Sequence, residues 1–486
     1  MSDANAPIRT RFAPSPTGPL HFGSVRTALF AWLAAHHSSG QFVLRIEDTD
    51  QERYIPGSEA LIIETLRWLR LEWDEGPETG GPDGPYMQSE RTELYRRYAE
   101  ELATRGSAYW CTCSVDRLTA LREEQRRRGE PTRYDRHCLK RQSAVAEERA
   151  AGNPAVLRLL MPGGETEWDD LVRGHVTFNN ADVDDQVLLK SDGFPTYHLA
   201  VVVDDHLMRI THVIRADEWI PSTPKHLAIY HALEWSPPRF VHVPAVLGPD
   251  GHKLSKRRGA RNVLEYGELG YLPGAVVNAM ALLGWSSGTD EEVFTLEDLA
   301  RVFTLERIHP SPAVFDPKRL DDLNGVHIRR MDTDDLVEAL EFHLPGTSKE
   351  TRRRLVPMLR ERMVTMEDAR KLAAPLVGSF APDPGVAFPP EGVSADTAAS
   401  LLRETIAAIA DGMLADPVAL RERLRAHVEA AGAKARVAFR VLFVAILGAP
   451  AGLPVFDSMT FLGAEESERR LRAALERLQQ PAARDG

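Results

Sequence analysis

Two groups of residues in this sequence have the types and spacing needed to bind a nucleotide. The first is a turn rich in Pro, Ser, Thr and Gly at residues 13–24, which contains Gly18, His21 and Gly23. Glycines in such a turn let the backbone approach phosphates, and a histidine can donate a hydrogen bond to them. The second is Lys253-Leu-Ser-Lys256-Arg257, flanked on both sides by glycine-containing turns. Its lysines therefore lie on a loop, as suits a phosphate clamp.

The first turn needs a strand before it and a helix after it. Ile8–Ala13 is apolar enough for a buried strand, and the pattern starting at Val25 predicts a helix. Gln41–Ile46 predicts a second strand that places Glu47 at its carboxyl end, where ligands bind in open parallel sheets. A carboxylate there can hold an ammonium group, although a helix-capping acid is the alternative. The apolar run Leu199–Val203 fits either a strand or a short buried helix.

The three cysteines of the chain all fall within one short segment. They are Cys111, Cys113 and Cys138. Three thiolates with one further donor can close a tetrahedral zinc site of structural type. The alternative is a metal-free insertion with reduced cysteines.

Composition favours a soluble protein of several domains. The chain has 486 residues, of which 27% are charged and 43% hydrophobic, and this length predicts about three domains. We find no apolar run long enough to span a membrane and no basic-then-apolar signal at the N-terminus. We therefore expect a cytoplasmic monomer that does not contact membranes.

The net charge of −12 argues against a nucleic-acid-binding protein as a whole. Local basic clusters matter more than the sum for a large protein that binds nucleic acid over part of its surface. Two such clusters lie in the C-terminal third, where the pattern is helical throughout. They comprise Arg352, Arg353, Arg354, Arg360 and Arg362, and then Arg421, Arg423, Arg425, Lys434, Arg436 and Arg440. The alternative is that these are merely solvated helix faces.

The order of the motifs resembles one enzyme family. Pro14-Ser-Pro-Thr-Gly-Pro-Leu-His-Phe-Gly23, then Arg45-Ile-Glu-Asp-Thr-Asp50, then the lysine motif, is similar to class I aminoacyl-tRNA synthetases of the bacterial glutamyl type. The first of these motifs contains His21, and Ser24 stands where many class I synthetases carry a second histidine. The resemblance implies an α/β fold: a Rossmann-type catalytic domain with an inserted acceptor-binding domain, followed by an all-α anticodon-binding region.

The resemblance also implies roles for individual residues. His21, Lys253 and Lys256 would be catalytic, and the ATP site would also include Gly18, Gly23 and Ser255. Glutamate would contact a further set of residues: Arg11, Ser15, Glu47, Tyr197, Val201 and Arg215. Two arginines suit a dicarboxylic amino acid, because glutamine would leave one desolvated guanidinium unpaired. The alternative is that both arginines form structural ion pairs.

Relatives of this family suggest two candidate positions for the fourth zinc ligand. Tyr134 stands where some glutamyl-queuosine synthetases use a tyrosine, which gives the set Cys111, Cys113, Tyr134 and Cys138. Other relatives use a histidine two residues after the last cysteine, where this chain has Lys140. His137, directly before Cys138, is a further alternative, although its position is sterically awkward for a ligand. Some members lack this zinc entirely.

The family organisation predicts five segments along the chain. Residues 1–110 and 186–250 would form the two halves of the catalytic domain, around an inserted domain at 111–185. Residues 251–330 would hold the lysine loop and contact the tRNA stem, and residues 331–486 would bind the anticodon.

The expected function is glutamate–tRNA ligation with ATP, Mg²⁺, L-glutamate and tRNA(Glu). One alternative is a relaxed ligase that also charges tRNA(Gln). Another is a catalytically silent paralogue that only binds tRNA.

Overall fold

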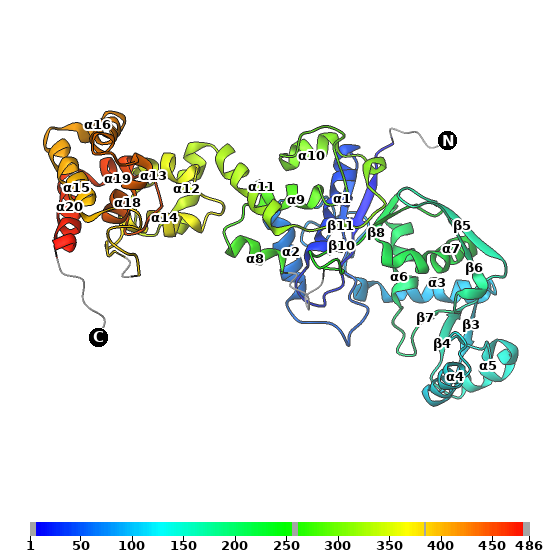
Figure 1. Ribbon diagram of the computed structural model, residues 1–486. Helices are drawn as coiled ribbons and strands as arrows, with labels where there is room; N and C mark the ends of the chain where they lie inside the picture. The colour runs from blue at the N-terminus through cyan, green and yellow to red at the C-terminus, as the bar shows by residue number, and fades with distance from the viewer. Residues whose placement is uncertain (1–5, 255–260, 383–384, 480–486) are drawn as a thin grey trace. The chain divides into compact units, whose positions relative to one another are not determined.

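The computed structural model describes residues 6–254, 261–382 and 385–479. The chain divides into two compact units. The first comprises Met1–Glu268 and Pro273–Leu320, and the second Leu269–Leu272 and Asp321–Gly486. Figure 1 labels many of the elements of both.

Parallel strands form the centre of the first unit. β1 (Arg9–Phe12) pairs in parallel with β2 (Gln41–Leu44), and β8 (His212–Ala216) with β9 (Arg239–Val243). The Thr211 N–H donates to the Arg9 carbonyl at 2.9 Å, which joins β1 to the start of β8. α1 (Phe22–His37) packs against β1, β2 and β8 and is buried over most of its surface, because it is apolar on nearly all sides. The predicted Rossmann-type core is confirmed.

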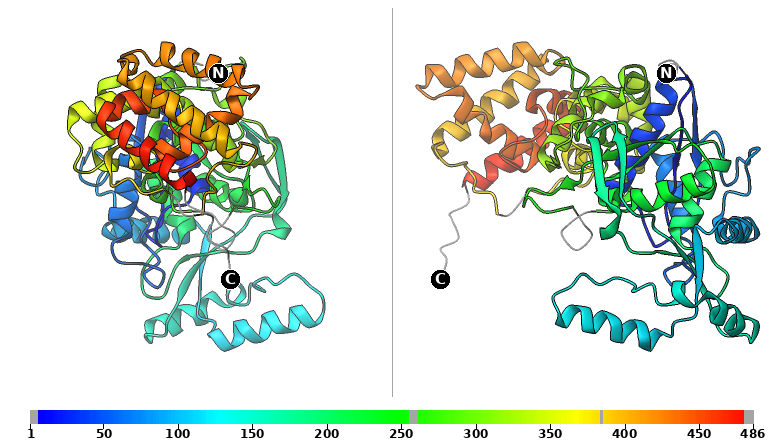
Figure 2. Two further views of the ribbon diagram at one scale, coloured as in Figure 1. Left: turned by 60° about the vertical axis from the view of Figure 1, so that its left-hand side comes forward. Right: turned by 90° about the vertical axis from the view of Figure 1, so that its right-hand side faces the viewer.

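The segment after β3 forms an insertion in this core. β3 (Ala108–Cys111), β4 (Val156–Leu159) and β7 (Val187–Leu189) form an antiparallel sheet. Figures 1 and 2 show β3 and β4 leading away from the parallel strands to two helices at the outer end: α4 (Val115–Arg127) and α5 (Gln142–Ala150). Ser114 caps α4 by accepting from the Arg117 N–H, as its position before a helical pattern favours.

A hairpin links the insertion to the parallel strands. β5 (Glu165–Asp170) and β6 (Gly174–Asn179) are antiparallel, and β5 joins β9 where Asp170 lies opposite Phe240. The resulting sheet has the order β6-β5-β9-β8. The last residue of β5 is thereby brought beside the central strands.

Leu199–Val203, which the sequence allowed as a strand or a helix, form part of a helix. These residues lie in α6 (Tyr197–Leu207), which also contains the buried carboxylates Asp204 and Asp205. A short apolar run is compatible with both structures. In the helix, Asp204 accepts from Arg91 at 2.8 Å and Asp205 accepts from Arg45 at 2.9 Å.

The remaining elements of the first unit surround this core. They are α2 (Ser58–Trp68), η1 (Gln88–Arg91), α3 (Thr92–Thr104), η2 (Cys138–Arg141), η3 (Asn180–Asp182), η4 (Asp217–Ser222), α7 (Thr223–Ala232), β10 (Val246–Leu247), α8 (Val263–Glu268), α9 (Pro273–Ala281), α10 (Leu296–Val302), η6 (Leu305–Arg307) and β11 (Ala313–Val314). α11 (Pro317–Arg330) continues into the second unit.

The second unit is helical and has no strand among its described residues, as the sequence predicts. Leu401, Leu442 and Leu471 are among the fully buried residues of its core. Its helices are α12 (Thr333–His343), α13 (Lys349–Arg360), α14 (Asp368–Val377), α15 (Ala395–Ala410), η7 (Met413–Ala415), α16 (Pro417–Ala430), α17 (Ala435–Ala438), α18 (Arg440–Leu447), α19 (Val455–Leu462) and α20 (Ala464–Gln479).

Several arginines of the two basic clusters are paired with carboxylates. Arg352 and Arg353 pair with Glu341 and Asp334, and Arg423 pairs with both Glu404 and Asp411. These pairs favour the solvated-face interpretation for those arginines. Within the described part of the chain, no helix combines the length and apolar character needed to cross a membrane.

Candidate active site

A cleft of about 470 Å³ opens at the carboxyl ends of the parallel strands of the first unit. Ligands bind at this edge in open α/β sheets. Nine residues expected from the sequence line it together: Arg11, Ser15, Gly18, His21, Gly23, Glu47, Tyr197, Arg215 and Lys253. The structure therefore joins the nucleotide motifs and the arginines in one cavity, although they come from distant parts of the chain.

One end of the cleft has the features of a phosphate site. His21 is the N-cap of α1, and its Nδ1 accepts a hydrogen bond from the Ser24 N–H at 3.2 Å. In the neutral ring this bond leaves the proton on Nε2, so the ring can donate from that nitrogen. Gly18 has a φ of 117°, which a side chain would disfavour.

Lys253 follows a turn that returns to β10. Its backbone forms a bridge with Leu247, and the Leu254 N–H donates to the Val246 carbonyl at 2.9 Å. The Lys253 ammonium forms an ion pair with Glu218, which also lines the cleft. Ser255 and Lys256 lie outside the described residues.

Arg11 and Glu47 belong to a buried charge network. Arg11 Nε donates to Asp205 at 3.0 Å. Arg45, which is fully buried, contacts the same carboxylate at 2.9 Å and Glu47 at 3.1 Å. Burial raises the pKa of Glu47 to about 7, and Arg45 and Arg11 oppose this only in part. Glu47 therefore faces the cleft as a buried carboxylate and does not cap a helix.

Arg215 is held differently from Arg11. Its guanidinium donates to His242 Nε2 at 2.9 Å and to Thr223 Oγ1 at 2.8 Å, and it contacts His226 Nδ1 at 3.1 Å. A longer bond of 3.4 Å reaches the Trp219 carbonyl. None of these partners is a carboxylate. Burial lowers the pKa of Arg215, and Tyr197 and Asp205 oppose this only in part.

Tyr197 and Val201 are one helical turn apart in α6. The Tyr197 ring packs against Trp219 with a centroid distance of 4.4 Å, and both residues line the cleft. Val201 lies in the core with Leu199 and Val203 and is not among the residues that line the cavity. Its contact with a substrate stays a prediction.

Comparison with known proteins identifies the family. A family model described as "tRNA synthetases class I (E and Q), catalytic domain" matches residues 7–322, and one described as "Anticodon binding domain" matches residues 335–475. Glutamate–tRNA ligase from Dehalococcoides mccartyi is 42% identical over 97% of this chain and 98% of its own length. The chain belongs to the glutamate–tRNA ligase family.

Two further relatives agree with this assignment. The glutamate–tRNA ligase of Acidothermus cellulolyticus is 45% identical over 96% of this chain and 95% of its own. A crystal structure of a glutamate tRNA ligase from Elizabethkingia meningosepticum in complex with its amino acid superposes with a TM-score of 0.89. It is 33% identical and covers 97% of this chain and 100% of that one. The family and fold predicted from the motifs are confirmed.

The three cysteines of this family member converge in the insertion. Their Sγ atoms all lie within 4.8 Å of one another. Tyr134 Oη lies 3.3 Å from both Cys111 and Cys113 and accepts from the Cys138 N–H at 2.9 Å. Three sulfur donors with one oxygen at the open corner fit the donor set of a structural zinc site.

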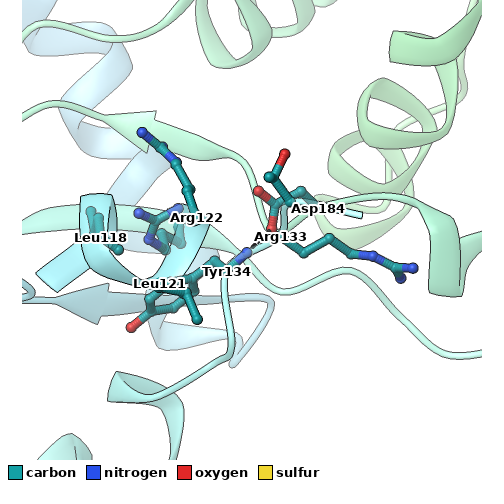
Figure 3. Close-up of a pocket in the computed structure, with 8 residues that line it drawn as sticks. Leu118, Leu121, Arg122, Arg133, Tyr134 and Asp184 are labelled. Carbon is teal, nitrogen blue, oxygen red and sulfur yellow. Dashed lines mark hydrogen bonds between the residues drawn. The ribbon is translucent and has the colours of Figure 1, made fainter. Parts of the chain in front are cut away.

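Two contacts fix the position of Tyr134 beside this cluster. Its backbone N–H donates to Asp184 at 2.9 Å, as Figure 3 shows, and Arg158 stacks on its ring at 4.1 Å from the centroid. The phenol oxygen is therefore held toward the sulfurs.

Sequence reasoning assigned no role to the residues that hold the two cleft arginines. These are Arg45, Asp205, Thr223, His226, His242 and Asp170. Two local signals exist: Arg45 begins the motif that ends at Asp50, and His242 is a polar residue inside the otherwise apolar run Phe-Val-His-Val.

Proposed function

We propose that the cleft activates L-glutamate, and that Arg11 and Arg215 bind its side-chain carboxylate. The observation that supports this most strongly is Arg215. It is 5% exposed and lines the cleft, yet none of its hydrogen-bond partners in the described chain carries a negative charge. A buried guanidinium without an anionic hydrogen-bond partner favours an anionic ligand. A carboxylate is suitable, because its two oxygens can accept two parallel N–H donors of a guanidinium.

The proposed reaction has two steps. A glutamate α-carboxylate oxygen attacks the α-phosphorus of ATP, and the bond to pyrophosphate breaks, which gives glutamyl-adenylate and pyrophosphate. A hydroxyl of the terminal adenosine of tRNA then attacks the activated carbonyl and releases AMP. Mg²⁺ accompanies ATP and neutralises phosphate charge. The protein contributes mainly by positioning and by cationic donors, with His21 and Lys253 at the phosphates.

The proposal includes tRNA(Glu) as the acceptor, with tRNA(Gln) as the alternative. The test is aminoacylation with labelled glutamate, using purified tRNA(Glu) and tRNA(Gln) in parallel. Charging of tRNA(Glu) alone is the expected result, and charging of both would identify a relaxed ligase. If the chain bound tRNA(Glu) but charged neither tRNA, the proposed reaction would be wrong.

Glutamate binding should depend on pH through Glu47. With a pKa near 7, its carboxylate is protonated as the pH falls and loses its attraction for the substrate ammonium group. We expect the KM for glutamate to rise below pH 7, approaching roughly tenfold per pH unit. Burial lowers the pKa values of His226 and His242 below that of an ordinary histidine, so both rings stay neutral in this pH range.

The pH effect is measured as the KM for glutamate at several pH values, with the KM for ATP as internal control. Glu47→Gln should weaken glutamate binding at neutral pH and remove the slope. A slope that persists in this variant would assign the titration to another group.

We further propose that Cys111, Cys113, Tyr134 and Cys138 bind structural zinc. Protein purified without chelator should contain one zinc per chain by elemental analysis, and Cys138→Ser should lose it and lower the melting temperature. Tyr134→Phe tests the fourth ligand, because it keeps the ring stacked on Arg158 but removes the oxygen. His137→Ala, at an exposed neighbouring position, is the control. Wild-type protein that lacks zinc would contradict the proposal.

A further inference from the structure

His242 accepts a hydrogen bond from the Arg215 side chain. Its Nε2 lies 2.9 Å from Arg215 Nε. A guanidinium can only donate, so this bond requires an unprotonated Nε2. Because guanidinium nitrogens form a rigid plane, a fixed Nε sets where the remaining donors point.

Asp170 determines which nitrogen of His242 carries the proton. The His242 Nδ1 lies 2.5 Å from Asp170 Oδ2, and both side chains are completely buried. Burial lowers the pKa of His242, against an opposing effect of Asp170, so the ring is neutral and has a single N–H. An ionised carboxylate can only accept, and the proton is therefore on Nδ1.

The second oxygen of Asp170 holds the carboxylate in place. Oδ1 accepts from the Val172 and Arg173 backbone N–H groups, both at 3.0 Å, and from the His242 N–H at 3.3 Å. Burial alone would raise the pKa of Asp170, but His242 and these backbone donors lower it below its usual range. Asp170 is therefore ionised at neutral pH.

We propose that Asp170 and His242 are positioning residues that orient Arg215 for the substrate carboxylate. The inference rests on the proposed function, in which Arg215 binds that carboxylate. It assigns a role in amino-acid recognition to a residue of the β5–β6 hairpin, which contacts His242 because β5 pairs with β9 at Asp170.

Asp170→Asn is the most selective test of this arrangement. The backbone N–H groups of Val172 and Arg173 require an oxygen at the Oδ1 position, so the new amide nitrogen must face His242 Nδ1. That nitrogen can only donate, which moves the ring proton to Nε2, opposite the Arg215 Nε–H. Two donors then face each other, and Arg215 must turn away.

We expect Asp170→Asn to raise the KM for glutamate by roughly 10- to 100-fold in tRNA(Glu) charging, since a hydrogen bond to a charged group is lost. The KM for ATP should not change. Asp169→Asn is the matched control, because this neighbouring side chain of the same strand is 91% exposed. An equal rise in both KM values, or a much lower melting temperature, would indicate a structural role and overturn the proposal.

A second pair of variants tests whether the effect passes through Arg215. In His242→Gln the amide oxygen can still accept from Arg215 Nε without help from Asp170. We expect the double variant Asp170→Asn, His242→Gln to be no worse than His242→Gln alone. Additive losses would overturn the relay.

Arg215→Lys separates this inference from the proposed function. A large rise in the KM for glutamate with Arg215→Lys but none with Asp170→Asn would retain the function and reject the relay. If Arg215→Lys had no effect, the proposed role of Arg215 itself would be wrong.

Discussion

Replacing Arg11 by glutamine should lower kcat/KM for glutamate by roughly 10²- to 10⁴-fold, since loss of one partner of a buried charge pair costs about 3–5 kcal/mol. Arg11 is 5% exposed, and its Nε is occupied by Asp205. Its Nη2 has no hydrogen-bond partner within the described residues, whereas Nη1 donates to the Ile214 carbonyl at 3.3 Å. The substrate carboxylate would lose this donor in a site from which water is largely excluded.

The same change should reduce discrimination against glutamine. A site with two guanidinium groups rejects an uncharged amide because one buried charge stays unpaired. With a neutral side chain at position 11, the penalty for the unpaired charge is smaller, and the ratio of the kcat/KM value for glutamate to that for glutamine should fall.

These values come from steady-state charging of tRNA(Glu) at varied glutamate, glutamine and ATP. Arg209→Gln is the matched control, because this arginine is 63% exposed and pairs with Asp83 outside the cleft. A parallel loss for ATP would indicate a general disturbance of the cleft. An unchanged glutamate-to-glutamine ratio would contradict the recognition role of Arg11.

Elements with a local signal could be predicted from the sequence. The strand, turn and helix around His21 follow from an apolar run, a cluster of turn residues and a helical pattern within thirty residues of chain. Ser114 stands before a charged helical stretch and caps α4, and the helical pattern of the C-terminal third predicts the helices of the second unit.

The supports of the cleft could not be predicted, because they join residues far apart in sequence. Asp170 and His242 are 72 positions apart, and Arg11 and Asp205 are 194 apart. Nothing in the local sequence of any of these residues indicates its partner, and only the packing of β5, β9 and α6 around β1 and β8 brings them together. The sequence motifs named residues that line the cleft, and the fold brings beside them the distant residues that hydrogen-bond to Arg11 and Arg215.

Replacing Lys253 by alanine should slow adenylate formation by roughly 10²- to 10³-fold, a loss typical of one donor to transition-state charge. The KM for glutamate should change little, because the proposed function places Lys253 at the phosphates of ATP and the two arginines at the amino acid. The ion pair of Lys253 with Glu218 does not prevent this role. Both side chains are about half exposed, at 55% and 51%, and exposed pairs contribute little.

If Lys253 acts through its positive charge, the loss of activity should depend on whether a substitution keeps that charge. Lys253→Arg keeps the positive charge and should retain much more activity than Lys253→Ala. The rate is measured as pyrophosphate release in a single turnover with tRNA(Glu) present, since later steps can limit kcat. Lys318→Ala, an exposed lysine outside the cleft, is the control. If alanine and arginine at position 253 slowed the step equally, shape and not charge would be what the reaction requires there. If neither slowed it, the phosphates would be bound by other groups.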